Sequence, residues 1–290
     1  MWALMTQCTD RCKRQISFPH TFEELFNLLD QQPDARIMAG GTDLLVALRH
    51  GLQDTRLIIC LERIDELRRI EELPDHSVSI GAAVTFGSMV RNPLLKERYP
   101  LLTQAASTVG GPAIRNMASI GGNIVTASPA ADSLPALYLL DARLELRSAT
   151  GSRTVAIDEF ILGPRRTLLQ PGEIISRIIL PPAQEWSIQC FEKVGRRKSL
   201  AIAVASLAAM LRLADDNTVT EARFAWGSVG PTVVRCPEAE AVLIGKPLLE
   251  ATLQAAATLA QQAVQPIDDI RATADYRRTV AGNLLFRLVA

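Results

Sequence analysis

Apolar residues recur along the N-terminal part of the chain with two periods, one typical of helices and one typical of strands. Positions 22, 25, 26 and 29 are apolar and share one helix face, and Thr21 followed by Glu24 forms a capping box in front of them. Pro33 and Asp34 then interrupt the pattern. A first helix is therefore predicted over residues 22–32.

The next segment predicts a strand, a tight turn and a second helix. Residues 36–39 have the character of a short buried strand, which leads into a glycine pair at positions 40 and 41. Thr42 and Asp43 are suitable caps for a helix over residues 44–50, and Gly51 is suited to end it. The predicted order is helix, strand, glycine turn, helix.

A second glycine-rich passage, residues 110–123, lies among further predicted elements. Before it, strands are expected at residues 56–60 and 78–80, and helices are expected to begin at Thr85 and to cover residues 100–109. After it, residues 143–147 and 153–157 alternate like the two strands of a hairpin.

The length of 290 residues and one cluster of breakers predict two domains. Pro181 and Pro182, followed by the polar residues 183–187, indicate a linker. We therefore expect an N-terminal tail at 1–14, a first domain at 15–182 and a second at 188–290. The second domain has strands predicted at 189–194, 201–213 and 218–226 and helices at 248–264 and 274–288, which is the pattern of a small α+β domain.

Composition indicates an ordinary soluble protein and narrows its partners. The 31 basic side chains are balanced by 31 acidic ones, so the chain has no net charge to attract nucleic acid or anionic lipid. No apolar run reaches the roughly 18 residues that span a bilayer, and the N-terminal tail lacks the apolar core of a signal peptide. A cytoplasmic location is therefore expected, without a membrane or nucleic-acid partner.

The five cysteines are too few and too scattered for a disulfide framework, and their spacing does not suit a zinc or iron–sulfur site. We expect reduced thiols and no metal ligands at any of them: Cys8, Cys12, Cys60, Cys190 and Cys236.

The two glycine passages are the strongest candidates for a binding site. A glycine pair between a strand and a helix lets a ligand approach exposed backbone N–H groups, and a helix N-terminus favours an anion there. Neither passage has the G-x-G-x-x-G pattern of a dinucleotide fold or the Gly-Lys-Ser/Thr of a P-loop. One glycine turn alone is more often only a tight turn, but two such turns favour a shared ligand. We expect a diphosphate between them.

The residues of both passages match a known pair of motifs. Residues 38–45, M-A-G-G-T-D-L-L, and residues 119–123, S-I-G-G-N, resemble the A-G-G-T-[DS] and T-I-G-G-N motifs of the FAD-binding subunits of molybdenum hydroxylases, such as the xanthine dehydrogenases. Downstream segments at 127–133, 171–174 and 191–197 also resemble that family, so the likeness spans residues 15–290. Ser119 stands where the family more often has threonine, and it keeps the hydroxyl group.

The resemblance implies an α+β fold in which residues 15–182 form a two-lobed FAD-binding domain of the vanillyl-alcohol-oxidase (PCMH) type. The small C-terminal α+β domain of the flavin subunit would follow. FAD would lie between the lobes, held by nineteen residues. The set is Arg36, Ile37, Met38, Ala39, Gly40, Gly41, Thr42, Asp43, Ala118, Ser119, Ile120, Gly121, Gly122, Asn123, Ser128, Asp132, Ile174, Phe191 and Lys193.

The resemblance also implies an oxidoreductase subunit whose partners carry the other redox centres. Electrons would come from a [2Fe–2S] subunit, a molybdopterin subunit would oxidise the substrate, and NAD or another acceptor would receive the electrons. These are binding residues, so no catalytic side chain is predicted. Two alternatives stay open: a cofactor-free assembly subunit, and a stand-alone flavin oxidoreductase.

Two groups of basic residues have no settled role from the sequence. Arg115 is equally suited to neutralise a phosphate or to tie its loop to a backbone carbonyl. Lys193, Arg196, Arg197 and Lys198 form a basic run that suits either a solvated strand end or a contact to FAD or a nicotinamide phosphate.

Overall fold

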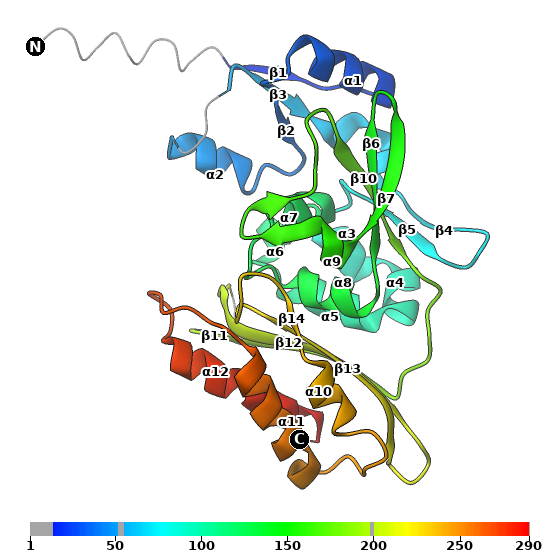
Figure 1. Ribbon diagram of the computed structural model, residues 1–290. Coiled ribbons are helices and arrows are strands. Elements are labelled where there is room, and N and C mark those ends of the chain that lie inside the picture. The colour runs from blue at the N-terminus through cyan, green and yellow to red at the C-terminus, as the bar shows by residue number, and fades with distance from the viewer. Residues whose placement is uncertain (1–13, 52–54, 198–199, 290) are drawn as a thin grey trace, which may run out of the picture.

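The chain is described here by a computed structural model that covers residues 14–51, 55–197 and 200–289. Two stacked lobes form its first part, and a third layered unit lies below them in Figure 1. The predicted N-terminal tail, with Cys8 and Cys12, lies outside the described residues except for Arg14. Cys60, Cys190 and Cys236 are free thiols, as predicted.

The first lobe is a small parallel sheet with two helices. The strands β1 (Gln15–Ser17), β3 (Leu57–Cys60) and β2 (Arg36–Met38) are paired in that order. The helix α1 (Phe22–Gln31) begins where the capping pattern predicts, because the Thr21 side chain accepts the N–H of Glu24 at 3.1 Å. The carboxylate of Glu24 accepts the N–H of His20 at 2.7 Å rather than that of Thr21.

The second lobe is a five-stranded antiparallel sheet in the order β4-β5-β10-β6-β7. Its strands are β4 (Ile70–Glu72), β5 (Val78–Gly81), β6 (Arg143–Ser148), β7 (Gly151–Ala156) and β10 (Ile174–Leu180). The helices are α3 (Phe86–Arg91), α4 (Pro93–Arg98), α5 (Pro100–Thr108), α6 (Pro112–Arg115), α7 (Ile120–Thr126), α8 (Ser133–Leu139) and α9 (Ile157–Phe160). Two short strands, β8 (Ile161–Gly163) and β9 (Arg166–Thr167), pair separately.

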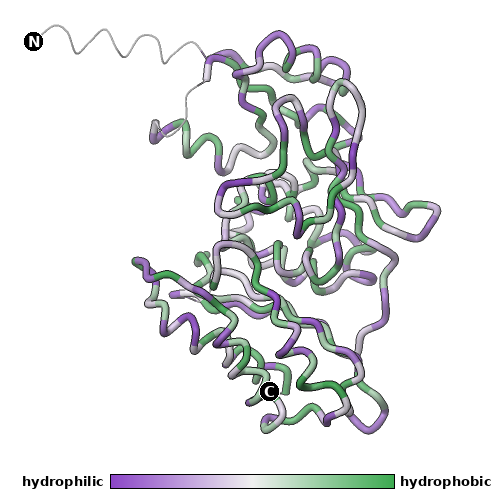
Figure 2. Tube along the Cα trace, in the orientation of Figure 1, coloured by the Kyte–Doolittle hydropathy of each residue, from purple (hydrophilic) through white to green (hydrophobic). Residues whose placement is uncertain are grey.

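The third unit is a four-stranded antiparallel sheet with helices on one side (Figure 1). Its strands are β11 (Ile188–Gly195), β12 (Ala203–Leu213), β13 (Val219–Gly227) and β14 (Val234–Arg235), and its helices are α10 (Pro237–Ala241), α11 (Glu250–Ala263) and α12 (Ala274–Asn283). In Figure 2, hydrophobic and hydrophilic positions alternate along these helices, whose apolar faces cover the sheet. The buried Trp226 fixes that contact by donating its indole N–H to the carbonyl of Ala281 at 2.9 Å.

Both faces of this sheet are buried, which joins the third unit to the second lobe. Phe191, Ala208, Met210 and Ala225 belong to the core of the first two lobes, whereas their neighbours along β12 and β13 face α11 and α12. Such alternation is the period-two consequence of strand geometry. The helices α5 and α8 of the second lobe therefore pack directly on the C-terminal sheet.

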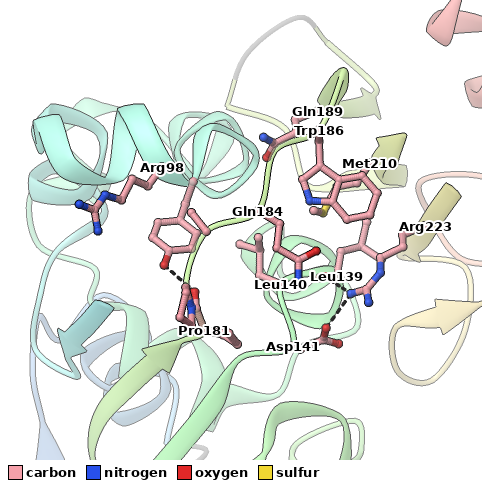
Figure 3. Close-up of a pocket in the computed structure, with 13 residues that line it drawn as sticks. Arg98, Leu139, Leu140, Asp141, Pro181, Gln184, Trp186, Gln189, Met210 and Arg223 are labelled. Atoms are coloured by element: carbon pink, nitrogen blue, oxygen red, sulfur yellow. Dashed lines mark hydrogen bonds and ion pairs between the residues drawn. The ribbon is translucent and has the colours of Figure 1, made fainter. Parts of the chain in front are cut away.

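The linker between β10 and β11 is held in place by specific contacts. The Tyr99 hydroxyl donates to the carbonyl of Pro181 at 2.6 Å, and Trp186 lies beneath the guanidinium of Arg212 at 4.6 Å. Arg223 is close to the same ring and pairs with Asp141 at 2.6 Å, as Figure 3 shows. These contacts hold the linker in place, and a small hollow lies beside it.

The sequence predicted most of the longer elements within a few residues and omitted several. It did not predict the helices α4, α6, α7, α8, α9 and α10 or the strands β1, β4, β8, β9, β10 and β14. All seven residues of α8 are buried, so the segment shows no polar face to mark it as a helix. No helix in the described part of the chain has the length and apolar character needed to cross a membrane.

Candidate functional site

The two glycine passages lie against each other. A Cβ atom added to Gly40 would fall 1.6 Å from the carbonyl oxygen of Met117 and 3.1 Å from the backbone nitrogen of Ala118. Only a residue without a side chain allows the backbones to come this close. Gly40 is therefore the point at which the first lobe touches the second.

The first passage leaves backbone donors open. The strand β2 pairs with β3 through Arg36, Ile37 and Met38 and leads into the turn, where Gly41 adopts a left-handed φ of +69°. The turn feeds α2 (Leu44–Arg49). Within the described residues, the N–H groups of Gly41, Thr42 and Asp43 donate to no acceptor, as expected at the beginning of a helix.

Asp43 occupies the N-cap position of α2 but makes no side-chain cap hydrogen bond, so the predicted capping role is wrong. Its carboxylate instead accepts the hydroxyl of Thr126, the last residue of α7, at 3.2 Å. The bond links the two passages a second time. Gly51 does follow α2 with a φ of +68°, as predicted.

Three backbone donors of the second passage already bond within the protein. At the beginning of α7, the N–H of Ile120 donates to Val84 and that of Gly121 donates to Ala82, at 3.0 and 2.9 Å. The N–H of Gly122 donates to the hydroxyl of Ser119 at 3.2 Å, which caps the helix. The N–H groups of Ile120, Gly121 and Gly122 are therefore not free to donate to a phosphate.

The two glycines of the second passage differ in what they touch. A Cβ on Gly121 would lie 2.6 Å from the Cβ of Ala82 and 2.7 Å from its carbonyl oxygen, so Gly121 allows α7 to pack on the sheet. Gly122 is exposed, and a Cβ there would meet only the Ser119 hydroxyl, at 3.0 Å. Gly122 therefore presents an open surface to a ligand. Asn123, next along, accepts the Ser133 hydroxyl at 2.7 Å.

A buried ion pair closes the site toward the C-terminal domain. The ammonium of Lys193 lies 2.5 Å from Oδ2 of Asp132 and 3.0 Å from the carbonyl of Thr108. The other carboxylate oxygen of Asp132, Oδ1, is buried and has no hydrogen-bond partner. Burial raises the pKa of Asp132, and the charge of Lys193 opposes part of that rise. Ser128 Oγ lies in the preceding turn and accepts the N–H of Ala130 at 3.3 Å.

Two of the predicted contacts lie mainly in the hydrophobic core. Ile174 is 3% exposed at the beginning of β10, opposite Arg147 of β6. Phe191 is also buried, and its N–H donates to the side chain of Gln104 at 3.0 Å. Lys193 shares the face of β11 with Phe191, because side chains two residues apart point the same way.

The side chain of Arg115 fixes its own loop through backbone carbonyls. Its guanidinium donates to the carbonyls of Val109 and Gly110 at 3.1 and 3.0 Å, which fixes the turn before α6. In the basic run, Arg196 donates to the carbonyl of Ile270, and Arg197 donates to that of Leu200. Lys198 lies outside the described residues.

Comparison with known proteins decides the family. Residues 12–183 match the family described as the FAD binding domain in molybdopterin dehydrogenase, and residues 189–290 match the CO dehydrogenase flavoprotein C-terminal domain. The chain belongs to the FAD-binding subunits of the molybdopterin dehydrogenases. Its cofactor is FAD, and its fold is the α+β arrangement of a PCMH-type domain followed by the C-terminal flavoprotein domain.

Relatives of this flavin subunit match it over nearly the whole of both chains, and they are named for different enzymes. It is 35% identical over 258 residues to the xanthine dehydrogenase FAD-binding subunit of Escherichia coli O157:H7, covering 89% of this chain and 88% of the relative. It is 34% identical to the carbon monoxide dehydrogenase medium chain of Hydrogenophaga pseudoflava, covering 93% of each chain.

Solved structures agree with these sequence relatives. A structure of carbon monoxide dehydrogenase from Hydrogenophaga pseudoflava matches with a TM-score of 0.88 at 33% identity, over 95% of each chain. Quinoline 2-oxidoreductase from Pseudomonas putida 86 matches with a TM-score of 0.90 at 28% identity, over 95% of each chain. The chain is therefore a medium-type subunit of a multi-subunit oxidoreductase.

The residues present are suited to a flavin dinucleotide. The open N–H groups of Gly41, Thr42 and Asp43 are donors for phosphate oxygens, and Gly122 is an exposed position without a side chain on the second passage. The orphaned Asp132 Oδ1 is an acceptor for a hydroxyl or a ring N–H, since a buried carboxylate oxygen without a partner is unfavourable.

The sequence did not predict the residues that contact the two glycine passages and Lys193 from neighbouring segments. Met117 and Ala82 contribute only backbone or a methyl group, and Thr126 and Thr108 lie outside the recognised motifs. None carries a side-chain signal that spacing along the chain would expose. Their roles follow from contacts between segments far apart in sequence.

Proposed function

We propose that this chain is the electron relay of a xanthine dehydrogenase-like complex. It would receive electrons from a [2Fe–2S] subunit, and NAD would accept them. The observation that carries the proposal is the junction at Gly40, which touches Met117 of the second lobe directly before the open donors of Gly41, Thr42 and Asp43. The proposal includes the domain limits at 15–182 and 188–290 and the nineteen binding residues given above.

The chain's own residues would bind and orient the cofactor. Gly41, Thr42 and Asp43 would hold the diphosphate by backbone N–H groups, and Gly122 would admit it to the second lobe. Asp132 would accept a hydrogen bond at Oδ1 while Lys193 holds the other carboxylate oxygen, Oδ2. FAD, when bound, supplies the chemistry that links one-electron centres to a two-electron acceptor.

The similarity to the Escherichia coli subunit named for xanthine dehydrogenase supports a purine as substrate. The substrate would bind to a molybdopterin subunit, so this chain influences the choice only through assembly. Relatives named for nicotinate and carbon monoxide, at 32% and 34% identity, define the other substrates to test.

The test is turnover of the intact complex, purified through a tag on this chain, with xanthine and NAD. We expect NADH formation by the complex and none by the isolated FAD-loaded chain with xanthine. Turnover by the isolated chain would show a stand-alone oxidoreductase, and full activity of a complex whose chain lacks FAD would show a scaffold. Turnover with nicotinate or carbon monoxide instead of xanthine would overturn only the choice of substrate.

A further inference from the structure

The loop of residues 265–273, between α11 and α12, displays two isoleucines almost entirely to solvent. Ile267 is 73% exposed and Ile270 is 88% exposed, the two most exposed large apolar side chains in the described chain. Exposure of apolar side chains to water is unfavourable, and covering them with another surface would stabilise them. We call residues 265–273 the isoleucine loop.

The isoleucine loop is held in one conformation. The carboxylate of Asp269 accepts the N–H groups of Arg271 and Ala272, at 2.8 and 3.2 Å, and also both of the guanidinium groups that reach it. Those guanidiniums belong to Arg271 and to the buried Arg277, at 2.7 and 2.6 Å. A loop fixed in this way presents its isoleucines without an entropic cost on binding, as a preorganised interface does.

The same hydrogen bonds connect the loop to the wall of the flavin site. Arg277 donates to the carbonyl of Ser228 at 3.1 Å, and the N–H of Ser228 donates to the carbonyl of Pro129 at 2.9 Å. Pro129 lies in the turn between Ser128 and Asp132. A second link comes from Arg196, three residues after Lys193, which donates to the carbonyl of Ile270 at 3.1 Å. A partner seated on the loop would therefore be linked through these bonds to the turn that holds the proposed FAD-binding residues Ser128 and Asp132.

Charge around the loop favours a negative partner. Arg196 and Arg197 are exposed and bond only to backbone carbonyls, with no carboxylate partner in the part of the chain that the structure describes. A [2Fe–2S] cluster ligated by four thiolates carries net negative charge. Basic side chains around an apolar centre fit the surface of a protein that brings such a cluster close.

We propose that the isoleucine loop is the docking surface for the iron–sulfur subunit. This rests on the proposed function, because the electron donor is the subunit that must lie beside the flavin. Ile267 and Ile270 would be the apolar anchors of the contact, and Arg196 and Arg197 would form its charged rim.

The test compares the double variant Ile267→Ser, Ile270→Ser with Ile244→Ser in complexes purified through this chain. Ile244 is an exposed isoleucine of the same domain, and its neighbour Gly245 bonds to Val219, the first residue of β13. The isoleucine loop is anchored beyond the other end of β13, where Gln265 bonds to Val229. At about 3.3 Å per residue the two ends of the strand are roughly 25 Å apart. We expect the double variant to keep its FAD and melting temperature but to lose at least about tenfold in iron per flavin. The control should match the wild type.

Iron per flavin equal to wild type in the double variant would overturn the proposal, as would loss of molybdenum with retention of iron. The single variant Ile270→Lys provides a second check that changes only the most exposed side chain. Failure of the proposed function would look different, because the wild-type complex itself would then form no NADH with xanthine and NAD.

Discussion

Replacing Gly40 by alanine is expected to push the two lobes apart, with loss of FAD and a fall in melting temperature of roughly 5–10 °C. The new methyl group would have to occupy space 1.6 Å from the Met117 carbonyl oxygen, and backbone on both sides cannot yield cheaply. Overpacking of this kind costs on the order of 3 kcal/mol. Thermal unfolding and flavin fluorescence measure the two effects.

Gly122→Val is the matched partner of that variant. The Cβ of that side chain would meet only the Ser119 hydroxyl, so we expect a near-normal melting temperature but roughly tenfold or greater weakening of FAD binding. Gly172→Ala controls for backbone strain alone, since Gly172 has a φ of +78° and no atom within 4 Å of its added Cβ. A Gly40→Ala chain as stable as Gly172→Ala would contradict the packed junction, and normal FAD affinity in Gly122→Val would remove Gly122 from the site.

Lys193→Met is expected to destabilise the chain by about 3–4 kcal/mol at pH 8, because it leaves the Asp132 carboxylate buried without its ammonium. The double variant Asp132→Asn, Lys193→Met removes both charges and should lie within about 1 kcal/mol of the wild type. Both should bind FAD more weakly. Urea unfolding at two pH values measures the stability.

The pH dependence has a definite sign. The pKa of Asp132 in the folded chain is raised above its ordinary value of 3.8, and loss of Lys193 raises it further. A carboxyl of this kind contributes most stability below its unfolded pKa and loses that contribution as pH rises through its folded pKa. Lys193→Met should therefore be less destabilised at pH 5 than at pH 8. An equal loss at both pH values would show that packing, not charge, is responsible.

Local signals along the sequence predicted the first lobe well. The Thr21 cap, the glycine pair after β2 and Gly51 after α2 each act within a few residues, so their chemistry is visible in the sequence. The linker after Leu180 was visible for the same reason, since paired prolines end a strand. The family motifs then supplied the cofactor, which physical reasoning alone had narrowed only to a diphosphate.

Long-range features could not be predicted in this way. The approach of Gly40 to Met117 and the pairing of Lys193 with Asp132 join segments more than 60 residues apart. The backbone donors of Ile120 and Gly121 look free in the sequence, yet the carbonyls of Val84 and Ala82, just after β5, accept them. Whether the N–H groups of a glycine turn are free depends on which segment lies beside the turn, and only the fold shows that.

The central claim is that this chain holds the FAD of its complex, and the flavin content of separated subunits tests it most directly. The complex is purified, its subunits are separated without denaturation, and released flavin is identified by mass spectrometry. We predict about one FAD per copy of this chain, which stays with this chain on separation. A complex without flavin, or a flavin that follows another subunit, would contradict the account.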